Sequence, residues 1–187
     1  MTIVRPLHTY YSVFPLSLGG WTEYNAVDRM KKGLPVVVQG DGTSLWTVTH
    51  ARDFAKAFLG MMGRKAAIGE AYHITSDEVL TWNQIYDQLA KAAGVKAKIV
   101  HITSKNIIDY ADQNGFASEE GGLWGDKSHC AIFDNSKIKK LVPDYVATIP
   151  YAEGIKETLA WFEADPKRMI INPETTRLLD GLIKKYG

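Results

Sequence analysis

The sequence has little of three features that would each point to a class of protein. One cysteine among 187 residues cannot form a disulfide framework or a multi-cysteine zinc site within the chain. No stretch approaches the ~18 apolar residues that a membrane helix needs, and no charged and apolar leader opens the chain, so we expect a cytoplasmic protein without membrane contact. Lysine and arginine number 22 against 21 aspartates and glutamates, and this net charge of +1 disfavours binding to nucleic acid.

Common catalytic and metal-binding motifs are also missing. Gly40-Asp41-Gly42 is followed by Leu45 where a dinucleotide fingerprint needs its third glycine, so we expect a hairpin turn between strands at 34–38 and 44–48. No Walker loop, Gly-x-Ser-x-Gly elbow or His-Glu-x-x-His helix occurs. The five histidines are separated without ligand spacing, and we therefore predict no metal site.

The remaining reactive side chains have ordinary structural interpretations. Free cysteine is usually buried, so we expect Cys130 to be a buried or partly buried structural residue. Its neighbour His129 would point to the opposite face of a strand, which makes Cys130 a weak candidate for a nucleophile. The pairs Asp77-Glu78 and Glu119-Glu120 are expected to be solvated loop charges, since nothing apolar around them would separate their pKa values.

Helices and short strands alternate along the chain, about six of each, which is typical of an α/β fold. Continuous apolar strands occur beside short alternating ones, so we expect part of a parallel sheet together with a small mixed α/β lobe. The expected helices are 21–32, 51–62, 82–93, 104–111, 136–141, 151–163 and one starting at Asn172; the expected strands are 1–10, 34–38, 44–48, 71–74, 98–102 and 131–133.

Local signals define some of these elements well. Thr81 and Gln84 form a capping box before the helix at 82–93, and Asn172-Pro173 begins the last helix. Thr49 is expected to cap the helix at 51–62. That helix has an apolar face that we expect to be buried, consisting of Phe54, Ala55, Phe58, Leu59 and Met62.

The opening stretch, Met1 to Tyr10, has the composition of an interior strand of a larger sheet. Thr2, Ile3 and Val4 are β-branched, and Pro6 closes the run. A first strand normally has a lead-in and this one has none, so we expect further sheet to precede it.

Three segments carry a resemblance to a known family: Thr2-Ile-Val-Arg-Pro6 with His8-Thr9-Tyr10; 48–57, which contains His50 and Asp53; and Phe133 to Trp161 with Ile149-Pro150-Tyr-Ala-Glu-Gly154. Together they resemble the C-terminal half of extended short-chain dehydrogenase/reductases, the NAD-dependent epimerase/dehydratase group. The resemblance implies that residues 1–165 form the C-terminal, substrate-binding part of such an enzyme and that residues 166–187 are a helical extension.

The resemblance further implies a preceding Rossmann half that holds NAD or NADP on a Gly-rich loop and carries a catalytic Tyr-x-x-x-Lys. None of the nine tyrosines here has a lysine four residues later, so we predict no catalytic residue in this chain and no tight binding of the cofactor to it alone. The family places Pro6, Leu7, His8 and Thr9 beside the nicotinamide. His50 and Asp53 are expected to be structural, with Asp53 favoured in the first turn of its helix.

Departures from the family bear on the substrate. The nucleotide-sugar epimerases hold the diphosphate with two arginines, and the matching positions here are Trp46 and Leu123. A diphosphate without cationic partners would be poorly compensated, which disfavours a nucleotide sugar. A small, less charged substrate fits better, and the substrate-contact residues that we predict are His8, Tyr10, Tyr11, Trp46 and Trp124. For the aromatic ones, burial in an interdomain core is an equal alternative.

The leading hypothesis is therefore the substrate-binding half of an NAD(P)-dependent oxidoreductase, epimerase or dehydratase, inactive by itself, with the Rossmann half as its partner. The alternative is a non-catalytic binding or interaction module, which in some relatives of this family is associated with RNA. Lys137, Lys139 and Lys140 are the only basic cluster, and a solvated helix face accounts for them. An isolated lobe would expose apolar surface, so homo-oligomers are also expected.

Overall fold

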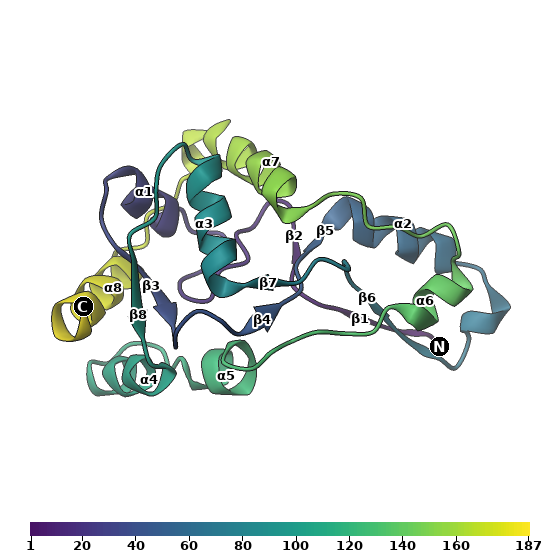
Figure 1. Cartoon of the computed structure of the whole chain (residues 1–187), viewed down its shortest axis with the longest axis horizontal. Coiled ribbons are helices and arrows are strands. Elements are labelled where there is room, and N and C mark those ends of the chain that lie inside the picture. The colour runs from purple at the N-terminus through teal and green to yellow at the C-terminus, as the bar shows by residue number, and fades with distance from the viewer.

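The computed structural model describes residues 1–187 and shows an elongated molecule with a parallel strand pair at each end (Figure 1). The N-terminus lies at one end, beside β1 (Ile3–Pro6) and β6 (Ala71–Ile74), and the C-terminus lies at the other, beside β3 (Val36–Gln39) and β8 (Ile99–Ile102). Helices and parallel strands alternate, so the predicted α/β class is confirmed.

The β1–β6 end is built from one parallel pair and two helices. Pro6 is paired with Ile74 at the carboxyl end of the two strands. The helices α2 (Ala51–Met61) and α6 (Ser136–Leu141) pack beside the pair. This end has its own small core, which consists of Ala57, Met61, Ala67, Tyr72, Ile74, Ile138, Val142 and Tyr145.

The β3–β8 end is covered more completely. All four residues of β3 are buried, and α4 (Ser104–Gln113) and α8 (Pro173–Tyr186) contribute most of the apolar side chains of this end. The C-terminal residues predicted as an extension thus supply Leu178, Leu179 and Leu182 to the core that contains Val37 and Ile102.

Between the ends lies the largest core, 20 buried residues that include Trp46, Trp82 and Phe162. It is enclosed by α1 (Asn25–Lys31), α3 (Trp82–Ala92) and α7 (Tyr151–Glu163) and by two short pairs: parallel β2 (Thr9–Tyr10) with β5 (Thr49–His50), and antiparallel β4 (Leu45–Trp46) with β7 (Leu80–Thr81). The short α5 (Glu120–Gly122), a π-turn at Leu123–Lys127 and 3-10 turns at Lys65–Ala67 and Pro166–Arg168 complete the chain.

Elements with complete local signals form as predicted. The Thr81–Gln84 capping box precedes α3, and Trp82, Ile85 and Leu89 on that helix are buried. Asn172 caps α8, with Pro173 at its first position. No helix is both long and apolar enough to cross a membrane.

The predicted hairpin across Gly40–Gly42 is wrong. The strand before this turn, β3, pairs with the distant β8, and the strand after it, β4, pairs with β7. The expected strand at 131–133 is also wrong, since only a single bridge joins Ala131 to Trp46. Both errors concern strand pairing, which depends on packing between segments far apart in the sequence.

Two predictions about α2 are wrong as well. Thr49 does not cap the helix, because its Oγ1 accepts a hydrogen bond from the Ser76 amide, and His50 Nδ1 accepts from the Arg52 amide instead. Leu59 and Met62 are 65% and 60% exposed, and Phe58 is also exposed, so most of the apolar face expected to be buried lies on the surface.

Smaller corrections concern element ends and single residues. The strand expected over Met1–Tyr10 is divided into β1 and β2, and α1 begins at Asn25 rather than Trp21. Thr103, not Ser104, caps α4, which continues to Gln113. Cys130 is exposed rather than buried, and its Sγ accepts a hydrogen bond from the Leu45 amide over 3.3 Å.

Candidate functional site

The carboxyl ends of β1 and β6 meet at one place in the molecule. Residues 7–9 leave β1 there, and residues 75–78 leave β6 beside them, since the two strands are parallel and in register. Ligands of open α/β sheets bind at the carboxyl ends of the strands. The carboxyl ends of β1 and β6 therefore form the candidate functional site.

His8 is the central side chain of this region. Its ring stacks on Trp46 with centroids 4.3 Å apart and meets the Trp21 ring edge-on at 4.6 Å. The His8 carbonyl accepts a hydrogen bond from the Thr49 amide, which joins the segment after β1 to β5. A surface pocket of about 270 Å³ opens here, lined by Pro6, Leu7, His8, Thr9 and Trp21.

The His8 imidazole is neutral. Burial, reinforced by the charge of Lys127, lowers the pKa of His8 to about 3. His8 Nε2 lies 3.7 Å from Asp126 Oδ2, but an unprotonated ring makes no ion pair at that distance. Its Nδ1 is buried and has no hydrogen-bond partner. In this state His8 offers one N–H donor and one acceptor rather than a positive charge.

A second buried group lies behind the pocket. Tyr10, His50 and Tyr151 are fully buried, and the Tyr10 ring stands edge-on to both of the others, with centroids 5.4 Å and 5.2 Å away. Both hydroxyls and His50 Nε2 lack hydrogen-bond partners. Burial is the main cause that raises the pKa of Tyr10 and Tyr151 and lowers the pKa of His50, so all three are neutral.

Gly154 makes this close packing possible. A Cβ at this position would lie 2.2 Å from the Tyr10 hydroxyl and 2.9 Å from His50 Cδ2. Any larger residue would therefore displace rings at the centre of the molecule. Position 154 in the Ile149–Gly154 segment therefore requires glycine because there is no space for a side chain, not because of its backbone conformation.

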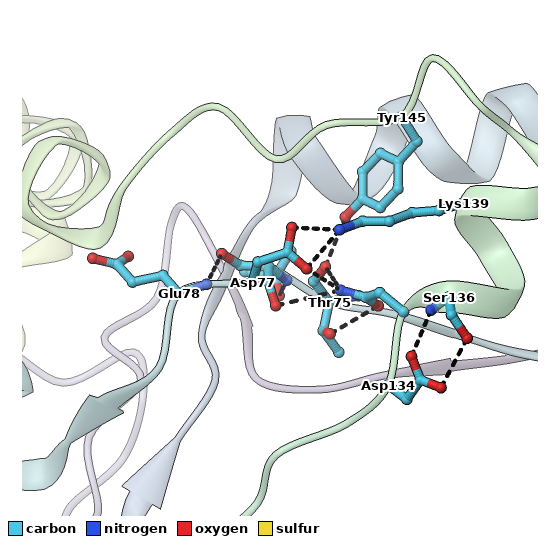
Figure 2. Close-up of polar contacts among 10 residues, drawn as sticks. Thr75, Asp77, Glu78, Asp134, Ser136, Lys139 and Tyr145 are labelled. Carbon is cyan, nitrogen blue, oxygen red and sulfur yellow. Dashed lines mark hydrogen bonds and ion pairs between the residues drawn. The ribbon is translucent and has the colours of Figure 1, made fainter.

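A polar network fixes the backbone after β6 (Figure 2). The Tyr145 hydroxyl donates to the Thr75 carbonyl over 2.8 Å. The Asn135 side chain accepts from the Thr75 amide and donates to the Thr75 carbonyl. Asp134 in turn accepts from the Ser136 amide at the start of α6. Because these groups satisfy one another, the network holds the segment in place and leaves little for a ligand.

The neighbouring carboxylates have separate roles, and Figure 2 shows that of Asp77. Asp77 forms an exposed ion pair with Lys139, as expected of a solvated charge. Glu78 differs from the prediction, because its Oε2 accepts a hydrogen bond of 2.7 Å from the Tyr151 amide at the start of α7. A carboxylate there satisfies an otherwise free N–H and is favoured by the helix dipole.

The residues predicted from sequence are only partly brought together. Pro6, Leu7, His8 and Thr9 share one pocket. Trp46 and Tyr10 are fully buried and do not line this pocket, although Trp46 stacks on His8, which does. Tyr11 and Trp124 are exposed: Tyr11 stands edge-on to His50, and Trp124 belongs to the π-turn at Leu123–Lys127.

Two contributors to the site were not predicted. Trp21 lines the pocket, although its sequence context suggested the buried face of a helix. Lys127 acts on the pKa of His8 from the π-turn. Neither has a local signal, because both reach His8 only through the folded chain. Asp53 is structural as expected: it is buried and accepts from the Ile149 amide over 2.8 Å.

The Gly40–Gly42 turn and the histidine, cysteine and carboxylate side chains lack the arrangement of the usual phosphate and metal sites. Gly40–Gly42 leads into the short strand β4, so no helix N-terminus follows the turn. No group of three or more His, Cys, Asp or Glu side chains is close enough to hold a metal ion.

Comparison with known proteins adds to this picture. No protein-family model matches the chain. It is 30% identical over 122 residues to the chloroplast stem-loop binding protein of 41 kDa b from Arabidopsis thaliana, covering 58% of this chain and 32% of that protein. It is 25% identical over 113 residues to 2'-dehydrokanamycin reductase from Streptomyces kanamyceticus, covering 60% and 30%. The chain thus spans about a third of the length of these relatives.

Solved structures show the same fold. A UDP-glucuronic acid 4-epimerase from Bacillus cereus, in complex with UDP-glucuronic acid and NAD, matches with a TM-score of 0.62 and 18% identity over 87% of this chain and 45% of its own. An epimerase from Methanothermobacter thermautotrophicus matches with a TM-score of 0.66 and 18% identity over 90% and 44%. The chain has the fold of the epimerase/dehydratase group. The fold implied by the resemblance to extended short-chain dehydrogenase/reductases is confirmed, and the chain covers less than half of each of these structures.

Proposed function

We propose that this chain is the substrate-binding part of an NAD(P)-dependent oxidoreductase, epimerase or dehydratase whose Rossmann half docks on the β1–β6 end. The observation that carries the proposal is that β1 has a free edge and an exposed apolar side. β1 hydrogen-bonds only to β6, and Ile3 within it is 44% exposed. A four-residue parallel strand with an apolar exposed side is typical of an interior strand, since parallel sheets are covered on both faces.

The exposed face of α2 continues this surface. Phe58 and Met62, together with Val4 of β1, line a hollow of about 360 Å³ in which six of nine lining residues are hydrophobic. Apolar surface of this kind marks an interaction site. In the proposed protein the adjoining strands and helices of the Rossmann half cover it, and in their absence copies of this chain associate through it.

The residues of this chain do not fit a whole dinucleotide. The Pro6–Thr9 pocket presents no charged side chain, because its only titratable residue, His8, is neutral. The Gly40–Gly42 turn leads into the short strand β4 and not into a helix that could hold the diphosphate. When bound, NAD(P) supplies the hydride; we propose that this chain contributes Pro6, Leu7, His8 and Thr9 to the nicotinamide side and does not bind the cofactor tightly alone.

The substrate proposed for this protein is small and carries no diphosphate. The two positions of the expected cationic anchors are Trp46 and Leu123, and both side chains are fully buried. A neutral His8 can donate to or accept from a hydroxyl or carbonyl of the substrate.

The test is a titration of the purified 187-residue chain with NADH and with NADPH, followed by the fluorescence of the dinucleotide. We expect no saturable binding in the micromolar range and no turnover. A parallel measurement is the intact mass of the protein isolated from its source cells, which should include a Rossmann half. Micromolar binding with turnover by this chain alone would contradict the proposal.

A second candidate is an RNA-associated module, favoured by the similarity to a protein named for stem-loop binding. The charges of the chain do not support it: Lys137 and Lys139 are engaged with Glu70 and Asp77, and the net charge is +1. Phosphate binding depends on free cationic groups and weakens steeply with salt. A gel-shift assay with a stem-loop RNA over a salt series distinguishes the two, since the favoured proposal expects no shift at physiological salt.

A further inference from the structure

The helix α4 ends in an asparagine followed by a glycine, and both residues are exposed. Asn114 is the C-cap of the helix, and Gly115 has a φ of +72°, the left-handed conformation that glycine adopts at helix ends. The Phe116 amide donates to the Ala111 carbonyl over 3.0 Å and closes the turn. The chain thus presents an asparagine side chain on the surface, directly before a residue that has no side chain.

The amide nitrogen of Gly115 is free and uncrowded. It forms no hydrogen bond, whereas the Asn114 amide donates to the Tyr110 and Ala111 carbonyls. A Cβ on Gly115 would meet no atom within 4 Å. The nitrogen that follows the Asn114 side chain in the chain is therefore open to reaction.

The Asn114 side chain is held by a single contact. Its Nδ2 donates to the Tyr110 carbonyl over 2.8 Å, and the side chain forms no other hydrogen bond. The last turn of a helix opens more readily than its interior. When this turn opens, the Asn114 carboxamide and the Gly115 nitrogen can rotate toward each other.

The other five asparagines of the chain lack this combination. Asn25 and Asn135 are buried, and hydrogen bonds fix both ends of each side-chain amide. Asn83 and Asn106 lie within helices, and each is followed by a residue with a larger side chain. Asn172 precedes a proline, whose nitrogen carries no hydrogen.

We propose that Asn114 is a site of spontaneous deamidation, with water as the only other reactant. The Gly115 nitrogen attacks Asn114 Cγ; the new N–Cγ bond forms, the Cγ–Nδ2 bond breaks, and ammonia leaves with the hydrogen of the Gly115 amide. The attack is favoured because both groups belong to one chain. Water then opens the cyclic imide. Opening at Cγ gives aspartate, and opening at the main-chain carbonyl gives isoaspartate.

Either product alters the end of α4. A carboxylate at position 114 stands at the negative end of the helix dipole and cannot donate to the Tyr110 carbonyl, as Nδ2 does. Isoaspartate also lengthens the main chain just before Phe116, whose ring stacks with Tyr110 and lies under Arg177 of α8. The modification should therefore loosen the contact between this turn and α8. The proposal goes beyond the proposed function, because it involves neither cofactor nor substrate.

The experiment is incubation of the purified 187-residue chain at neutral and at mildly alkaline pH, followed by mass spectrometry of the tryptic peptide 106–127. We expect a gain of one mass unit at Asn114, at least about tenfold faster than at Asn106 in the same peptide, because ring closure depends strongly on the placement of the reacting atoms. The rate should rise with pH, since the attacking amide loses its proton. Equal gains at the two asparagines, or none at Asn114 in the time that modifies the free peptide, would overturn the proposal.

Variants test the assignment and its consequence. Asn114→Gln keeps an amide but closes a ring less readily, so it should stop the appearance of isoaspartate, measured with an isoaspartyl methyltransferase. Asn106→Gln, the same exchange earlier on α4, is the matched control and should leave the rate unchanged. Continued formation of isoaspartate in Asn114→Gln would refute the site. Asn114→Asp carries the charge of one product, and unchanged amide hydrogen exchange at residues 111–116 in this variant would refute the loosening of α4.

Discussion

The two ends of the molecule have nearly the same local structure and opposite surroundings. β1–β6 and β3–β8 are both parallel pairs of four-residue strands in register. β3 is buried along its whole length, whereas three of the four residues of β1 are exposed. Since the strands are alike, the difference lies in what covers them: α8 and α4 complete one end, and the other ends in the exposed face of α2.

This contrast shows that a strand can be exposed in the structure and still have the amino-acid composition of an interior strand. Thr2, Ile3 and Val4 are as β-branched as Val36, Val37 and Val38, a composition that suits burial on both faces. Edge strands usually carry charges, bulges or prolines that prevent further pairing. β1 has only Arg5 and Pro6 at its end, and its exposed side is therefore better explained as an interface.

The largest effect is expected from truncating matched leucines at the two ends. Leu182→Ala removes a fully buried side chain from the core of the β3–β8 end and should lower the free energy of unfolding by about 2–5 kcal/mol. Leu59→Ala, on the exposed face of α2, should change it by less than about 0.5 kcal/mol. Urea unfolding of both variants measures this, and equal losses would show that the two ends are equally covered.

A pH experiment tests the junction between the ends, where His8 is buried. The pKa of His8 is about 3 in the folded chain and about 6.5 when unfolded. The unfolded state therefore takes up a proton first, and stability should fall as the pH falls from about 6.5 toward 3, by up to about 1.4 kcal/mol per pH unit for one such group. His8→Phe should flatten this slope in pH-dependent urea unfolding. His101→Gln, at an exposed histidine of β8, is the control, and the same flattening in both would refute the assignment to His8.

Association between copies of the isolated chain should depend on the β1–β6 end only. Leu59→Asp places a charge on the exposed face of α2 and should shift the isolated chain toward monomer in sedimentation velocity, since an apolar contact would have to bury a carboxylate. Leu34→Asp introduces the same change at an exposed leucine before β3. If Leu34→Asp dissociates the chain and Leu59→Asp does not, the interface lies at the wrong end.

The smallest effects are expected from single ion pairs. Asp180 accepts from Arg29 Nη1 over 2.6 Å, and Arg29 is buried at the β3–β8 end, so Asp180→Asn should cost about 1 kcal/mol. Asp77→Asn breaks the exposed pair with Lys139 and should cost less than about 0.5 kcal/mol. Thermal unfolding of both variants is the measurement, and a larger loss for Asp77→Asn would reverse the comparison.

What the sequence predicts well is local. The Thr81–Gln84 box and the Asn172-Pro173 start each act within one turn of helix, and both helices form where expected. The pairing of β3 with β8 joins residues far apart, and no turn residue specifies it. The turn signal at Gly40–Gly42 is real, but a turn does not specify which strands pair. The hairpin predicted there is wrong for this reason.

The prediction that the apolar face of α2 is buried fails for a different reason. The spacing of Phe54, Phe58 and Leu59 correctly predicts an amphipathic helix. Periodicity identifies the apolar face of a helix, but it does not identify the element that packs against that face. In the candidate site, the sequence resemblance located Pro6–Thr9 in one pocket, whereas Trp21 and Lys127 come to His8 only through tertiary packing. The stacking of His8 on Trp46 also could not be read from positions so far apart.

The most direct test of the contrast between the ends is amide hydrogen exchange, residue by residue, in the isolated 187-residue chain. Both strands are paired along one edge only, but β1 has an uncovered face while β3 is buried along its whole length, so we predict that β1 amides exchange at least about tenfold faster than β3 amides. Equal protection of the two strands would contradict the account and show that the β1–β6 end is complete by itself.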